Sequence, residues 1–417
     1  MTGYDEALAT ILAQASRQAA IRVPAAAAIG SILAEDIVSK HWLPPFDNAA
    51  MDGFALRHAD LGPLEIEYRV TGLQAAGDGR ASASGDAWEI TTGARMPDGF
   101  DTVIPVEQVE ISARDETGSP ARVRLLESPE PGQHVRRRGE DVTPDRLLIR
   151  SSEYLQPQHL MMLAAQGIEE VAVAPRPRVA LLITGSELAD ATTRCLGSGQ
   201  IRDSNGPFLN ARVEAAGAEV VFRRTLGDDS AAYAQALDEA LRAGAEIVLS
   251  TGAVSMGRFD FVPDALRQAG AEILFHKVRI RPGKPLLFAR LPNGALYFGL
   301  PGNPISSAVG LRFFVEPALR GMLGMPPERP LTVALAHPYK KREGLRFHLR
   351  ARLFADDGNT LRAEILPGQE SFRIAPMLRA NAWAVAAEDR GALAAGDSID
   401  IYGLGHLFPV GMEMRTA

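Results

Sequence analysis

The sequence predicts a multidomain protein of class α/β plus β, with a central α/β domain whose sheet is mostly parallel. Three observations support this. The chain has 417 residues, which exceeds a single-domain core. Apolar strands and amphipathic helices alternate from about Arg178 to Gly321, a pattern typical of a sheet covered on both faces. Short β-like runs between glycine-rich turns occupy the stretch from Asp47 to Arg138 and return after Pro330.

Composition is that of an ordinary globular protein and excludes several classes. Hydrophobic residues make up 46% and charged residues 23% of the chain. The formal net charge of -7 argues against a nucleic-acid binder. A single cysteine, Cys195, allows no intrachain disulfide and favours a reducing cytoplasm. Asp5 and Glu6 stand where a signal peptide would carry positive charge, and no long apolar span occurs, so we expect a soluble cytoplasmic protein without a membrane partner.

The N-terminal region predicts a β domain inserted between helical pieces. An amphipathic helix is expected from Tyr4 to about Gln18. Two prolines in Leu43–Phe46 forbid a helix and indicate an extended linker. The β-like stretch follows, and the pattern returns to a helix over Ser151–Gly167. We expect the two helical pieces to pack together.

The central region reads as alternating strands and helices. The helix expected from Ser230 to Ala243 has apolar positions at four-residue spacing and ends at Gly244, a natural C-cap. A further helix is expected from about Ile305 to near Gly321. The other predicted elements are strands at Arg178–Thr184, Glu219–Arg224, Ala245–Leu249 and Ala295–Gly299 and a helix at Asn205–Ala216.

A linker by composition, Met325–Pro330, precedes a small all-β domain. Asp356–Asn359 predicts a hairpin turn within it. The strands expected here are Leu331–Ala336, Arg346–Leu353, Thr360–Leu366, Ala382–Ala387 and Ser398–Tyr402.

Two loops that directly follow buried strands carry the first functional signal. They are Ser250–Gly257, with Gly252 and Ser255, and Leu300–Pro304, with Gly302. In an open α/β sheet ligands bind at the carboxyl ends of strands, where small residues let backbone N–H groups close on an anion. An acid, Asp260, and several cations lie nearby in sequence: Lys277, Arg279, Arg281 and Lys284. Together they indicate a phosphate-bearing substrate held with a divalent metal.

Other candidate residues have a structural alternative that the sequence leaves open. Asp52 follows a turn that Asp47 could cap, and Thr92 stands at an ordinary strand exit. Glu187 follows a buried strand and so belongs at the ligand edge. The runs Asp203–Asn205 and Asp228–Ser230 read as helix N-caps or as ligands. The histidines show no metal-ligand spacing, so oxygen ligands and Mg²⁺ are favoured.

Five motifs in this order resemble the MoeA family of molybdopterin molybdenumtransferases, strongly up to about Gly324. They are Pro45–Gly53, Arg137–Asp141, Thr184–Leu188, Pro282–Pro285 and Leu300–Pro304.

The resemblance implies a homodimer whose protomer has four parts. A discontinuous helical linker region takes 1–46 and 139–176, and an inserted β domain takes 47–138. An α/β domain of the molybdenum-cofactor biosynthesis type takes 177–325, and a C-terminal β-barrel takes 329–417. The active cleft would lie between the α/β domain of one subunit and the β domain of the other. The implied reaction inserts molybdate into adenylylated molybdopterin with release of AMP, depends on Mg²⁺, and involves transient contact with the adenylyltransferase and with molybdoenzyme chaperones.

The resemblance and the loop positions together assign the site residues. The expected catalytic residues are Asp52, Asp141, Glu187, Asp260, Lys277 and Lys284. Metal is expected on Asp260, Glu187 and one of the pair Asp228 and Asp229, with Asp228 taken first. The expected substrate-binding residues are Thr92, Ser250, Gly252, Ser255, Arg281, Pro301, Gly302, Pro304, Arg350 and Ser371.

The chain departs from the family pattern at four places: Ser186, where an acid is usual; Ala253, where glycine is usual; Arg281, where lysine is usual; and the bulky loop Gln369–Ile374. Two alternatives were weighed, a molybdopterin adenylyltransferase and a non-catalytic scaffold such as gephyrin. The sequence leaves molybdate and tungstate equally open, because both are tetrahedral dianions of similar size.

Overall fold

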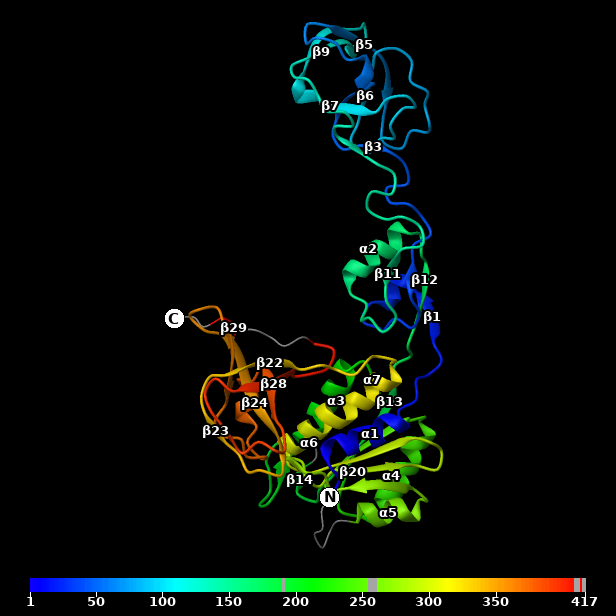
Figure 1. Ribbon diagram of the computed structural model, residues 1–417. Coiled ribbons are helices and arrows are strands. Elements are labelled where there is room, and N and C mark those ends of the chain that lie inside the picture. The colour runs from blue at the N-terminus through cyan, green and yellow to red at the C-terminus, as the bar shows by residue number, and fades with distance from the viewer. Residues whose placement is uncertain (190–191, 254–260, 409–412, 415–417) are drawn as a thin grey trace. The chain divides into compact units, whose positions relative to one another are not determined.

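The computed structural model describes residues 1–189, 192–253, 261–408 and 413–414. The chain forms two compact units (Figure 1). The larger unit comprises Met1–Glu35, Ser151–Gln156 and Glu170–Ala417, and the smaller unit comprises Asp36–Arg150 and Pro157–Glu169. None of the helices in the described ranges is both long and apolar enough to cross a bilayer.

A six-stranded sheet forms the centre of the larger unit. Its order is β16 (Glu219–Leu226), β13 (Arg178–Thr184), β17 (Ile247–Thr251), β21 (Leu296–Leu300), β20 (Leu287–Arg290) and β18 (Glu272–His276). The first four strands are parallel, and β20 and β18 run antiparallel at one edge. The predicted, mostly parallel sheet is confirmed.

Helices cover both faces of this sheet, and the central strand β13 is apolar from Val179 to Ile183 (Figure 1). Val179, Leu181 and Ile183 point into one core, and the alternate residues Ala180 and Leu182 point into the other. The first core is shared with α1 (Tyr4–Gln14), α3 (Asn205–Ala215), α6 (Pro304–Gly310) and α7 (Glu316–Met322). The second is shared with α4 (Ser230–Arg242) and α5 (Val262–Gln268).

The first helix ends earlier than predicted and packs on the α/β sheet. α1 stops at Gln14, and Tyr4, Ala7 and Ile11 are buried in the first sheet core. The helix expected over Ser151–Gly167 is shorter, α2 (Pro157–Ala165), and lies in the smaller unit. Antiparallel strand pairs, not helix packing, join the chain segments on either side of the inserted region: β1 (Ile21–Pro24) with β12 (Glu170–Val173), and β2 (Ile37–Val38) with β11 (Leu147–Ile149). The four-domain boundaries stay a prediction.

The smaller unit is built on a six-stranded β sheet, as expected for an inserted β domain. The order is β7 (Thr102–Pro105), β4 (Gly53–Leu56), β6 (Ala87–Ile90), β5 (Glu67–Gln74), β9 (Pro120–Leu125) and β8 (Val109–Arg114). A separate short pair, β3 (Asn48–Ala49) with β10 (Val135–Arg136), lies beside the points where the chain enters and leaves this region.

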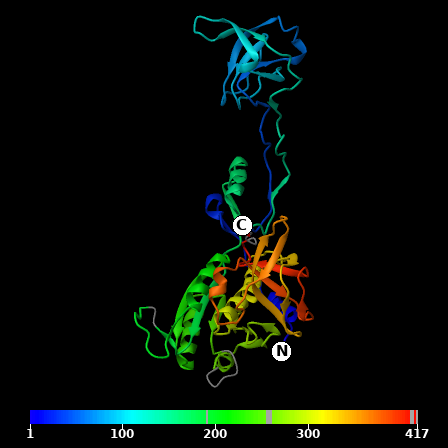
Figure 2. The ribbon, with the colours of Figure 1, turned by 90° about the vertical axis from the view of Figure 1, so that its left-hand side faces the viewer.

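The C-terminal part of the larger unit is a closed five-stranded barrel, which confirms the expectation. Its order is β24 (Arg346–Ala355), β25 (Leu361–Ile365), β22 (Leu331–Leu335), β28 (Ser398–Gly403) and β26 (Ala382–Ala386), and β26 pairs back with β24. The predicted hairpin turn joins β24 to β25, and Asp356 accepts hydrogen bonds from the amides of Gly358 and Thr360. In Figures 1 and 2 the orange and red barrel strands lie beside the yellow helices α6 and α7.

A buried charge network ties the barrel to the α/β region. Glu316 is 0% exposed and forms ion pairs with Arg212 at 2.7 Å and with Arg312 at 3.5 Å. It also accepts a 2.9 Å hydrogen bond from the amide of His406, which follows the last barrel strand. Burial raises the pKa of Glu316 although the two arginines act against this shift.

A second contact between barrel and α/β region contains an uncharged histidine. His348 of β24 is 1% exposed, and its ring centroid lies 4.3 Å from that of Phe313 and 5.6 Å from that of Tyr4. Neither ring nitrogen has a hydrogen-bond partner among the residues that the structure describes. Burial, with the charges of Arg346 and Arg312, lowers the pKa of His348 to about 3.

This histidine predicts that acid destabilises the larger unit. Because the unfolded His348 binds its proton near pH 6.5, its contribution to stability is intact above that pH and is lost progressively down to about pH 3. Between pH 6.5 and 5 the loss from this one group is about 2 kcal/mol. We expect the urea midpoint of His348→Phe to fall less over this range than that of the unchanged protein; equal pH slopes would contradict the assignment. His406, whose burial also lowers its pKa to about 3, leaves the variant a residual acid sensitivity.

Candidate active site

The carboxyl ends of β13, β17 and β21 open into one cavity of ≈ 710 Å³, called here the edge cavity. Its wall is mostly small and polar. The residues that line it are Ile183, Thr184, Gly185, Glu187, Leu188, Ile201, Arg202, Asp203, Ser204, Asn205, Asp228, Thr251, Gly252, Ala253, Gly302, Asn303, Pro304, Phe372 and Ile374. The predicted edge of the sheet is thus where the structure places a cavity.

The three strand ends are held against one another at Gly252. The Thr184 hydroxyl donates a 2.8 Å hydrogen bond to the carbonyl of Thr251, and the amide of Gly252 donates to the carbonyl of Leu300 at 3.1 Å. Gly252 has φ +84°, and a Cβ atom there would lie 2.6 Å from both oxygens of Thr184. Only glycine fits this close approach without displacing a loop.

Three carboxylates line the edge cavity, and two of them, Glu187 and Asp228, are expected metal ligands. The choice between Asp228 and Asp229 is made by local geometry. Asp229 is the N-cap of α4 and accepts from the amides of Ala231 at 2.8 Å and Ala232 at 3.2 Å. Asp228 instead accepts a 2.8 Å hydrogen bond from the hydroxyl of Ser186, the residue that replaces the usual acid.

These two carboxylates fit magnesium rather than an all-protein metal site. The described ranges contain no group of three His, Cys, Asp or Glu residues arranged to hold a metal ion. Mg²⁺ is usually bound through one or two carboxylates, with substrate phosphates and water completing the shell. Asp260, the third expected metal ligand, and Ser255 lie outside the described residues.

The loop Pro301–Pro304 forms one side of the edge cavity. The Asn205 side-chain amide donates a 2.8 Å hydrogen bond to the carbonyl of Gly302. Pro301 is buried, and its carbonyl accepts from the Ser307 hydroxyl, so it supports the loop from behind. The carbonyl of Ser371, from the barrel, accepts a 3.0 Å hydrogen bond from the amide of Ile305. The expected residues Gly302, Pro304 and Ser371 therefore lie close together.

Two residues expected to bind substrate have other places. Ser250 is fully buried within β17, because this strand runs two residues further than the predicted Ala245–Leu249. Arg350 is 0% exposed, and its guanidinium donates to the carbonyls of Arg373 at 2.5 Å and Glu370 at 3.3 Å. Neither residue lines the edge cavity. Arg350 instead fixes the position of the loop that carries the lining residues Phe372 and Ile374.

The expected cations Lys277, Arg281 and Lys284 are not among the described residues that line the edge cavity. Arg281 lines a second cavity of ≈ 430 Å³ together with Gln369 and Glu370, and its guanidinium carbon lies 5.4 Å from the ring centroid of Phe347. The backbone joins Lys277 and Lys284 into one turn, since Lys277 donates to Leu286 at 2.8 Å and Val278 donates to Lys284 at 3.0 Å. Among the described lining residues, the one cation is Arg202.

The smaller unit brings two expected residues together. Asp52 accepts a 2.6 Å hydrogen bond from the amide of Thr92, although the two are forty positions apart in sequence. Asp141 lies elsewhere in this unit, where its amide donates to the carbonyl of Leu43 at 3.0 Å. Asp47 makes long-range contacts rather than the local turn cap considered for it: it accepts from the amide of Arg138 at 2.7 Å and from the guanidinium of Arg137 at 2.9 Å.

Some lining residues escaped the sequence assignment. Asp203 and Asn205, for which the sequence leaves a helix cap and a ligand role open, both line the cavity at the start of α3, and Asp203 also accepts a 2.8 Å hydrogen bond from the amide of Gly206. Phe372 and Ile374 come from the barrel, and apolar residues in a loop carry no chemical signal. The unusual bulk of Gln369–Ile374 was the one available hint.

The structure combines a mostly parallel sheet, an inserted β unit and a C-terminal barrel. Comparison with known families shows that this combination belongs to a class of multidomain proteins with a probable molybdopterin binding domain. Residues 2–167 match the MoeA N-terminal region (domain I and II), residues 180–321 match a probable molybdopterin binding domain, and residues 332–404 match the MoeA C-terminal region (domain IV). The chain belongs to the MoeA family.

Individual relatives agree over nearly the whole length. The chain is 35% identical to the molybdopterin molybdenumtransferase of Synechococcus elongatus over 414 residues, which is 96% of this chain and 99% of the relative. It is 37% identical to molybdopterin molybdenumtransferase 2 of Mycobacterium tuberculosis, over 78% of this chain and 82% of that one. Among solved structures, the molybdopterin biosynthesis MoeA protein of Pyrococcus horikoshii superposes with a TM-score of 0.78 at 29% identity, covering 96% of this chain and all of that chain.

Proposed function

We propose that this protein is a transferase of molybdenum cofactor biosynthesis that inserts molybdate into adenylylated molybdopterin and releases AMP. The observation that carries the proposal is the near full-length match to a relative named for this activity. The match includes the inserted β region, which a molybdopterin adenylyltransferase lacks, so that alternative has no support, and no feature favours a scaffold role.

The edge cavity suits a diphosphate substrate. Its glycine-lined strand ends let the backbone approach an anion, and Arg202 supplies positive charge in the wall. The Thr184 and Asn205 side chains hold the loops that shape the cavity, through their bonds to Thr251 and Gly302. Glu187 and Asp228 would hold Mg²⁺, which when bound would neutralise charge on the phosphoryl oxygens. With the ion bound, Glu187 and Asp228 would favour binding of the anionic substrate, because the positive charge would offset the repulsion between like charges.

We further propose that the protein works as a cytoplasmic homodimer in which Asp52 and Thr92 complete the site of the partner subunit. The hydrogen bond between them supports a shared role. Contacts with the adenylyltransferase and with molybdoenzyme chaperones belong to the same proposal. Light scattering at micromolar concentration tests the assembly, and a monomer would refute it.

The activity is tested with purified protein, adenylylated molybdopterin, molybdate and magnesium. AMP release should require both molybdate and Mg²⁺ and should parallel the formation of active cofactor. AMP release without active cofactor would contradict the proposed insertion, and tungstate in place of molybdate would show which oxyanion the site prefers.

The neighbouring acids Asp228 and Asp229 give a matched test of the metal assignment. Asp228→Asn should lower AMP release by about tenfold or more, because one carboxylate of the Mg²⁺ shell is lost, and excess magnesium should restore part of it. Asp229→Asn should stay close to the unchanged rate, since asparagine is an equally good N-cap. Equal losses in the two variants would mean that Asp228 acts on the fold and not on the metal.

A further inference from the structure

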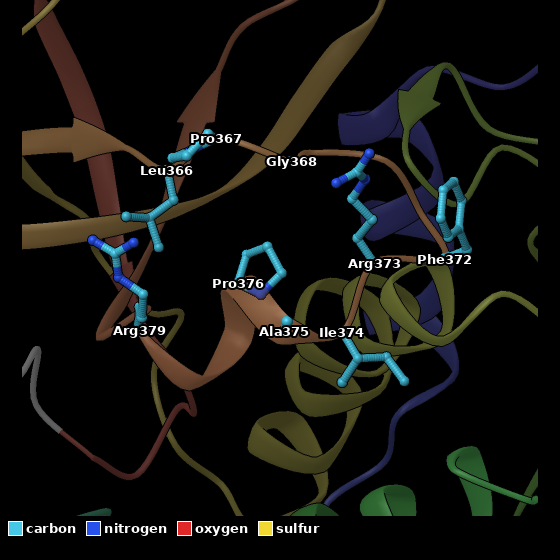
Figure 3. Close-up of a pocket in the computed structure, with 9 residues that line it drawn as sticks. All are labelled: Leu366, Pro367, Gly368, Phe372, Arg373, Ile374, Ala375, Pro376 and Arg379. Carbon is cyan, nitrogen blue, oxygen red and sulfur yellow. The ribbon is translucent and has the colours of Figure 1, made fainter.

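One wall of the edge cavity comes from the barrel and not from the α/β sheet. Phe372 and Ile374 line the cavity from the loop between β25 and the short helical turn Ala375–Leu378. The same two residues border a neighbouring apolar pocket of ≈ 410 Å³ (Figure 3). The loop is therefore an apolar partition between the edge cavity and the barrel surface.

This loop has an ordered position. Ser371 is bonded to the first turn of α6, and the Arg350 guanidinium holds the carbonyls on either side of Phe372. The Gln369 side-chain amide adds hydrogen bonds to the carbonyls of Arg350 at 2.9 Å and Leu366 at 2.7 Å. Phe372 is thus presented by a scaffold with several independent supports.

The exposure of Phe372 is high for such a well-supported aromatic residue. Its exposed fraction is 63%, and the Arg373 guanidinium carbon lies 5.7 Å from its ring centroid. The arginine occupies one side of the ring, and the rest remains open to solvent. An open aromatic face beside a polar cavity is stabilised when a flat ring covers it.

Within the described part of the cavity wall, Phe372 is also the single aromatic residue. The remaining lining consists of small, polar and charged residues, which suit phosphates, together with the aliphatic side chains of Ile183, Leu188, Ile201 and Ile374. We propose that Phe372, with Ile374 beside it, stacks on a heteroaromatic ring of the substrate and sets the specificity of the site for that end of the molecule. The inference rests on the proposed function, whose substrate has two such rings, adenine and pterin, joined through its phosphates.

Equilibrium binding of AMP, of ribose 5-phosphate and of molybdopterin tests this on the full chain. Phe372→Ala should weaken binding of the ring-bearing ligand that it stacks on by about 5- to 150-fold, the range for aromatic stacking on a base, and should leave ribose 5-phosphate unchanged. Phe372→Trp should retain binding. Leu378→Ala is the matched control: it is 87% exposed on the same segment and does not line the cavity, so its effect should stay below about twofold.

Comparison of the AMP and molybdopterin measurements identifies the substrate ring on which Phe372 stacks. A loss confined to AMP assigns adenine, and a loss confined to molybdopterin assigns pterin. Unchanged affinity of Phe372→Ala for both ligands overturns the inference while leaving the proposed function intact. Equal losses for AMP and ribose 5-phosphate also overturn it, because the effect would then concern the phosphate or the fold. If the unchanged protein binds neither ring-bearing ligand, the proposed function itself fails.

Discussion

Gly252→Ala is expected to lower kcat/KM by about 100-fold or more, because a displacement of about 1 Å in a reacting site costs that much. The added Cβ would lie 2.6 Å from both the carbonyl and the hydroxyl oxygen of Thr184, so the ends of β13 and β17 must separate. That separation widens the edge cavity where the phosphates are proposed to bind. AMP release under saturating molybdate and magnesium measures the loss.

Gly294→Ala separates this collision from simple backbone strain. Gly294 has φ +89°, close to that of Gly252, but a Cβ there meets nothing within 4 Å. Both variants carry the penalty of a left-handed alanine, about 1–2 kcal/mol, and only Gly252→Ala carries the contact. Gly294→Ala should therefore lose stability but keep its rate. Similar activity of the two variants would show that the close approach at Gly252 has no bearing on the reaction.

Glu316→Gln is expected to destabilise the larger unit by about 3–5 kcal/mol, the usual result of removing one partner from a buried ion pair. The glutamine keeps the shape, but Arg212 at 2.7 Å and the 3% exposed Arg312 at 3.5 Å each lose one compensating charge. Glu328, which contacts Arg312 at 2.7 Å, limits the loss. The urea midpoint of the unfolding transition reports it.

An exposed ion pair provides the control for this substitution. Asp264 and Arg267 lie 2.5 Å apart with side chains that are 75% and 64% exposed. Solvent screens such pairs, so Asp264→Asn should change the free energy of unfolding by at most about 1 kcal/mol. If Glu316→Gln is no more harmful than Asp264→Asn, the buried network does not hold the barrel in place.

The sequence was most informative where burial is complete. Arg178–Thr184 was predicted with the bounds that β13 has, because a parallel strand covered on both faces is a continuous apolar run. The end of α1 was missed by four residues. Nothing in Ala15–Gln18 breaks a helix locally, and the chain turns there through tertiary contacts, such as the hydrogen bond from Arg17 to the carbonyl of Ala34.

The site was harder to predict because single residues of register decide it. Asp228 and Asp229 are chemically identical in sequence, and the start of α4 alone separates a cavity acid from a helix cap. β17 runs two residues further than predicted, which places Ser250 within the strand. Arg350 has the charge expected of a substrate ligand, but its buried guanidinium donates hydrogen bonds to backbone carbonyls of a neighbouring loop. No local sequence pattern reveals these contacts.

The bond between Ser371 and the start of α6 has a consequence for how the protein responds to its ligands. A substrate that touches both the α/β edge and the barrel loop must favour the state in which these two are docked, by mass action. Ligand occupancy should therefore protect the connection around Met325–Pro330 from proteolytic cleavage, and the degree of protection should report affinity. Cleavage of the linker between the α/β region and the barrel should therefore decrease as the fraction of ligand-occupied protein increases.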